Sequence, residues 1–204
     1  MKRITVVLTA IAMLLMLTAC GGEGAVNVVG RWQGEIEYAG IVNAFMSEND
    51  VLAASGVTLD SAPLTVTYTF LEDGTATCEF DKTAFNDKLM VVLKEILTPM
   101  MGMLGGTTVE EYIEKSGQTD EQLIRSLFTD EVYDGIVKTV AFEGTYTVKG
   151  DKLAVTVGGQ TSQAKVSLDG GTLSVASPIG VTTASALQET AMKALFPLTL
   201  KKVG

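Results

Sequence analysis

The stretch FEGTYTVKGDKLAVTVGGQTSQAKVSLDGGTLSV, residues 142–175, decides the fold of this chain. Apolar and polar residues alternate along it, and Gly-Asp, Gly-Gly and Asp-Gly-Gly signals interrupt the alternation roughly every ten residues. A period of two is typical of β-strands with one buried face. The short, regular turns favour an antiparallel meander. We therefore predict four consecutive strands joined by tight turns in this stretch.

The same alternation recurs in three segments before this stretch and in one at the end of the chain. The expected strands are residues 29–38, 64–71, 75–81, 142–149, 152–158, 161–168, 172–176 and 197–203. Eight strands in meander order can close into a barrel, because closure removes the exposed edges that an open sheet would leave. We predict a mainly β (α+β) fold, an eight-stranded antiparallel up-and-down barrel.

Residues 83–140, between the third and fourth expected strands, follow a helical period instead. An apolar stripe is formed by Phe85, Leu89, Val92, Ile96 and Met100. Thr108 with Glu111, and Thr119 with Gln122, have the spacing of capping boxes, which begin helices. We expect a helical insertion in the barrel here. Two smaller helices are expected at residues 40–54 and 184–195.

The N-terminal residues predict export and lipid attachment. Two basic residues follow Met1, and then comes an apolar run to Met16 that is short for a membrane span. This order is typical of a secretory signal peptide. Leu17-Thr18-Ala19-Cys20 resembles a bacterial lipobox, in which the cysteine carries diacylglycerol and an acyl chain such as palmitate. The alternative is an ordinary signal peptide with a chance cysteine.

The expected organisation follows from these segments. Residues 1–19 are a lipoprotein signal peptide, 20–27 a lipidated cysteine and tether, and 28–204 one folded domain that contains the insertion. The expected location is the extracytoplasmic side of the bacterial cell envelope, with the protein anchored in a membrane through the lipid on Cys20.

Composition excludes several classes of function. Acidic residues outnumber basic ones by 24 to 15, which argues against a nucleic-acid partner and against charge-driven membrane binding. The chain has no histidine, so Ser-His and Cys-His nucleophile pairs are excluded. We expect no enzyme, no metal and no cofactor.

Apart from Cys20 the only thiol is Cys78, which the alternation places on an apolar strand face.

Gly30-Arg31-Trp32, at the entry to the first of eight expected strands, resembles the G-x-W signature of lipocalins and of bacterial lipocalin-like lipoproteins. The resemblance implies a cup-shaped interior that binds a small apolar molecule. In lipocalins a late arginine packs on this tryptophan. No arginine follows Arg125 here, so only Lys201 or Lys202 could take that place.

Candidate ligand-binding residues are Trp32, Tyr68, Phe70, Phe80, Tyr146, Met100, Met101 and Met103. The aromatic residues could equally form the solid core of a small barrel. The methionines could form a pliable apolar lid. The alternative is a Cu(I) site, which is less favoured because no Cys or His lies near them in the sequence.

Residues 109–123 also resemble the helical arm of trigger factor, a chaperone, mainly through their helix caps. The sequence is therefore compatible with two functions. One is a carrier of a small apolar molecule or lipid, and the other is a non-enzymatic protein-interaction or envelope-assembly module with a solid barrel. A carrier requires an apolar cavity of roughly several hundred Å³.

Overall fold

The computed structural model describes residues 24–48, 53, 56, 58–103, 108–127, 133–134, 137–138, 140–181 and 186–204. The predicted signal peptide and Cys20 lie outside the described residues. No helix within the described residues is both long enough and apolar enough to cross a membrane.

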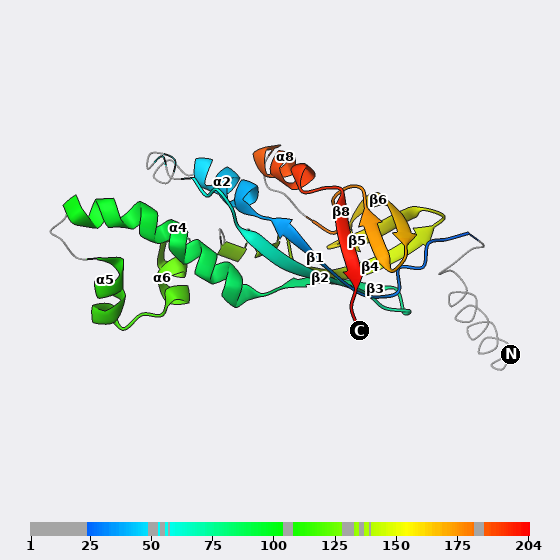
Figure 1. Cartoon of the computed structure of the whole chain (residues 1–204), viewed down its shortest axis with the longest axis horizontal. Helices are drawn as coiled ribbons and strands as arrows, with labels where there is room; N and C mark the ends of the chain where they lie inside the picture. Colours follow the sequence, from blue (N-terminus) through cyan, green and yellow to red (C-terminus); the bar gives the residue numbers. More distant parts are fainter. Residues whose placement is uncertain are drawn as a thin grey trace, which may run out of the picture.

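Eight antiparallel strands close into a barrel in simple chain order (Figure 1). They are β1 (Gly30–Glu37), β2 (Pro63–Phe70), β3 (Thr75–Phe80), β4 (Phe142–Lys149), β5 (Lys152–Val157), β6 (Gln160–Asp169), β7 (Thr172–Val175) and β8 (Leu198–Lys202). The predicted up-and-down barrel is confirmed, and every strand end lies within one residue of its expected position. Closure comes from β1, which pairs with β8 through Trp32 opposite Lys202 and Gln33 opposite Lys201.

Two glycines let neighbouring strands approach closely. A side chain at Gly34 would lie 2.8 Å from the carbonyl oxygen of Thr199 in β8. A side chain at Gly144 in β4 would collide with the backbone of Thr156 in β5. Both glycines therefore stand at inward-facing positions where the backbone of the neighbouring strand leaves no room for a side chain.

The helical insertion lies between two strands that pair directly with each other, since Cys78 of β3 is opposite Phe142 of β4. Its helices are α4 (Lys82–Met103), α5 (Val109–Ser116) and α6 (Asp120–Leu127). Figure 1 shows α4 leading away from one end of the barrel, with α5 and α6 beside it. We call these three helices the helical arm.

The local signals that predicted the arm are present in the structure. Both expected capping boxes form, with reciprocal hydrogen bonds between Thr108 and Glu111 and between Thr119 and Gln122. Helix α5 ends at Gly117, whose φ of 66° is the left-handed conformation that favours glycine. The first half of the α4 stripe is buried. The side chains of Ile96 and Met100 lie outside the described residues.

Two shorter helices, α2 (Ala39–Ser47) and α8 (Ala186–Ala194), pack against each other at the same end of the barrel as the start of the arm. Helix α8 lies within the expected range 184–195, whereas α2 begins one residue before the expected range 40–54 and ends at Ser47. The opposite end carries the β2–β3, β4–β5 and β6–β7 turns. There the amide of Val26 donates to the carbonyl oxygen of Gly150 at 2.9 Å, so the N-terminal segment reaches the barrel at its turn end.

Candidate functional site

The interior of the barrel is occupied by the aromatic residues expected to line a cup. Tyr68, Phe70 and Tyr146 are all buried. Their rings contact one another: the centroids of Phe70 and Tyr146 lie 5.1 Å apart edge to face, and those of Tyr68 and Phe70 lie 6.3 Å apart and stacked. The Tyr146 hydroxyl donates to the carbonyl oxygen of Leu71 at 2.9 Å. These rings therefore pack against one another inside the barrel.

Phe142 completes this group of rings, and the sequence alone did not single it out. Its centroid lies 5.9 Å from that of Tyr68, in an edge-to-face arrangement. An added side chain at Gly180 would come within 2.6 Å of the Phe142 ring, so the loop after β7 packs directly on that ring. Alternation placed Phe142 on the inner face, but only the contact with Gly180 shows how the loop and the core meet.

Trp32 is a structural anchor at the turn end of the barrel. It is 1% exposed, and its indole N–H donates to the carbonyl oxygen of Val28 at 2.6 Å. The ammonium of Lys202 lies 5.5 Å from the centroid of the ring, which is within the range of a cation–π contact. Of the two lysines considered as substitutes for the late arginine, Lys201 and Lys202, it is Lys202 that lies over this ring.

Cys78 lies inside the barrel beside Tyr68. Burial raises the pKa of the Cys78 thiol to about 12, and burial also raises the pKa of the Tyr68 hydroxyl. Both groups therefore stay protonated at neutral pH. A protonated, buried thiol is a poor nucleophile, which agrees with the expected structural role.

A second aromatic group lies where the arm leaves the barrel. Phe85 of α4 contacts Phe80 of β3 and Tyr38, with centroid distances of 5.3 and 5.5 Å. Beside them is a void of about 10 Å³ whose lining is apolar except for Lys88. This volume corresponds to roughly one water molecule. Phe80, expected to line the cup, thus connects the barrel to the arm.

A larger hollow, of about 440 Å³, lies on the outer wall of the barrel. Its floor consists of outward-facing side chains of β1, β2 and β3, and the start of α4 forms one side. A further hollow of about 230 Å³ lies at the β5–β6 hairpin, beside Gly180. Sequence reasoning missed both, because alternation identifies an outward face but does not show which helix or loop rises beside it.

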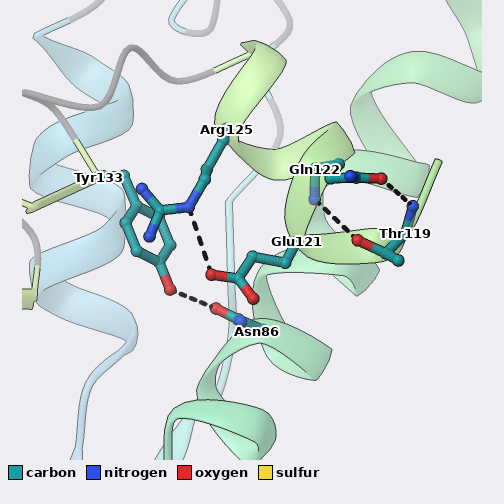
Figure 2. Close-up of polar contacts among 6 residues, drawn as sticks. All are labelled: Asn86, Thr119, Glu121, Gln122, Arg125 and Tyr133. Carbon is teal, nitrogen blue, oxygen red and sulfur yellow. Dashed lines mark hydrogen bonds and ion pairs between the residues drawn. The ribbon is translucent and has the colours of Figure 1, made fainter.

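The arm is held together by polar contacts between its elements (Figure 2). The hydroxyl of Tyr133 donates to Oδ1 of Asn86 in α4 at 2.7 Å. The guanidinium of Arg125 in α6 lies 4.5 Å from the centroid of the Tyr133 ring and also pairs with Glu121 at 3.3 Å. Tyr133 thereby joins α4 to α6.

The outer end of the arm carries a second ion pair and one exposed aromatic residue. Lys94 of α4 pairs with Glu110 of α5 at 3.0 Å. Tyr112 of α5 is 42% exposed. Met100, Met101 and Met103 lie in the last turn of α4, but their side chains lie outside the described residues. The proposed methionine lid therefore stays a prediction.

Comparison with known proteins adds no relative. No family model matches the sequence, and it matches neither a curated protein nor a solved structure. Within the described part of the chain, no three His, Cys, Asp or Glu residues are grouped so that they could hold a metal ion.

Proposed function

We propose that this protein is a lipid-anchored, non-enzymatic module of the bacterial cell envelope, in which a solid barrel is the base and the helical arm meets a protein partner. The observation that carries the proposal is the packed interior of the barrel. Tyr68, Phe70 and Tyr146 contact one another there and are at most 5% exposed. Side chains that fill an interior stabilise it and leave recognition to the outer surface.

The direction of the arm supports this proposal. The N-terminal segment reaches the barrel at its turn end, through the Val26–Gly150 hydrogen bond. The arm starts at the opposite end, after β3 (Figure 1). A lipid on Cys20 would therefore leave the arm on the side of the barrel that faces away from the membrane. Two-chain lipidation is sufficient for stable anchoring.

Site-specific photo-cross-linking in living cells tests the role of the arm. A photoreactive benzoylphenylalanine replaces Tyr112 on the arm or, as a matched control, Leu168 on the barrel, since these residues are 42% and 43% exposed. We expect one discrete cross-linked product from position 112 and none from position 168. Equal products from both positions, or none from position 112, would contradict the proposal.

A second candidate, a carrier of a small apolar molecule or lipid, rests on the void between the arm and the barrel. Tyr38, Val42, Leu64, Phe85 and Leu89 contribute apolar side chains to its lining. At about 10 Å³ it does not hold an acyl chain, so α4 would have to move away from Tyr38 to admit one.

Lipid extraction and native mass spectrometry of the purified protein distinguish the two candidates. The solid-barrel proposal predicts only the mass of the protein and its covalent lipid. A stoichiometric, non-covalent apolar molecule would instead establish the carrier function.

A further inference from the structure

We propose that the outer wall of the barrel, between β1, β2, β3 and the first turn of α4, binds a neutral saccharide unit. This site includes only the start of the arm, at the first turn of α4, and it does not depend on the function proposed above. The hollow there measures about 440 Å³, which lies within the usual range for sites that bind small molecules.

The register of the strands places three different hydrogen-bonding groups in one row. Gln33 of β1 is opposite Thr67 of β2, and Thr67 is opposite Glu79 of β3. All three line the hollow. An amide, a hydroxyl and a carboxylate thus lie side by side at the strand spacing of about 4.8 Å. Such a row can donate to and accept from the hydroxyl groups around a sugar ring.

These polar groups retain capacity for a ligand. The amide nitrogen of Gln33 reaches the hydroxyl of Thr67 only at 3.5 Å, the long limit of a hydrogen bond. Among the described residues, the side chains of Thr65 and Glu79 form no hydrogen bond. Asp81 differs, because its Oδ1 accepts the amides of Thr83 and Ala84 and so begins α4. Asp81 therefore shapes the wall, while Gln33, Thr67 and Glu79 face the ligand.

The remaining lining selects against anionic ligands. The described lining includes the carboxylates of Glu79 and Asp81 and no lysine or arginine. Phosphate groups and acidic sugars would therefore be repelled. Pro63 and the half-buried Phe80 add an apolar edge, against which the C–H face of a sugar ring can pack. A neutral molecule with many hydroxyl groups and one apolar face can form hydrogen bonds with the polar row and pack against the apolar edge.

Saturation-transfer NMR and isothermal titration calorimetry on the full chain, in a detergent without sugar groups, test the site. The probes are maltotriose, cellotriose and the β-1,4 trimer of N-acetylglucosamine. We expect saturable binding of at least one probe with a Kd of about 1 mM or below. Thr67→Val and Glu79→Gln should each weaken that binding at least about tenfold, because the first removes the hydroxyl and the second replaces the charged acceptor by a neutral amide.

Thr147→Val is the control, since Thr147 is likewise an outward-facing threonine, exposed where Thr67 is half-buried, but lies on β4, outside the hollow. It should leave the affinity unchanged. Circular dichroism confirms that each variant is folded. The proposal is overturned if none of the three probes binds saturably, or if Thr67→Val and Thr147→Val reduce binding equally.

Discussion

Replacement of Trp32 by alanine should destabilise the barrel more than almost any other single change, because three interactions meet at this side chain. The indole is 1% exposed, its N–H donates to Val28, and Lys202 lies over its ring. Truncation of a buried tryptophan costs about 3–5 kcal/mol through the cavity that it leaves. The lost hydrogen bond adds about 1 kcal/mol, because the carbonyl of Val28 loses a buried partner.

Two further variants separate these contributions. Trp32→Phe keeps most of the ring and removes the N–H, so we expect a loss of about 1–2 kcal/mol. Lys202→Met keeps an aliphatic stem over the ring and removes the charge, so we expect a loss of about 0.5 kcal/mol. The free energy of unfolding should therefore fall in the order Lys202→Met, Trp32→Phe, Trp32→Ala.

Urea unfolding followed by far-UV circular dichroism measures these changes. Tryptophan fluorescence is unsuitable, because Trp32 is the only tryptophan of the chain and two of the variants lack it. A small domain has a total stability of about 5–15 kcal/mol, so Trp32→Ala should lower the midpoint greatly or leave the protein unfolded in water. An unshifted midpoint for Trp32→Ala would refute its role as an anchor of the barrel.

Three other predictions concern the lipid, the thiol and the insertion. Cys20→Ser should move the protein from the detergent phase to the aqueous phase in detergent partitioning, because the net negative charge of the chain cannot replace a two-chain lipid anchor; retention on membranes after a high-salt wash would argue against the lipoprotein hypothesis. Cys78 should resist an aromatic disulfide reagent at pH 8 in the native protein and react in urea. Since burial raises its pKa from 9.0 to about 12, the unfolded chain loses this proton first, and the contribution of Cys78 to stability should decrease as pH rises above about 9. Excision of residues 83–140 with a short Gly-containing bridge should leave a β-rich protein that unfolds cooperatively, since β3 and β4 pair directly; loss of the β signal in circular dichroism would mean that the arm completes the core.

Much of the fold could be predicted because its signals are local. Alternation in Leu64–Phe70 and Phe142–Val148 marks which residues face inward, and burial agrees at each inward position except Gly144, which has no side chain to bury. The capping boxes before α5 and α6 depend on residues three positions apart, so their hydrogen bonds form as the sequence predicts. The resemblance left Lys201 and Lys202 open as the basic residue near Trp32, and the register of β1 with β8 places Lys202 there.

The candidate site could be predicted only in part. Sequence reasoning named Tyr68, Phe70 and Tyr146 as inward-facing residues but left open whether they line a cup or fill a core. That choice depends on the distance between rings from different strands, which alternation does not contain. Sequence reasoning also did not single out Phe142, whose role depends on the approach of Gly180 from a distant loop.

The eight strands, the inserted helices, the helix caps and the inward faces could all be predicted from local patterns, because each depends on neighbours a few positions away in the chain. Three features depend on the folded chain: the rings of β2 and β4 meet inside the barrel, Phe85 packs on Tyr38, and Gln33, Thr67 and Glu79 lie in one outer row beside α4. The physical reason is that packing and register join residues far apart in sequence, and the volume left between them is a property of the closed barrel rather than of any one segment.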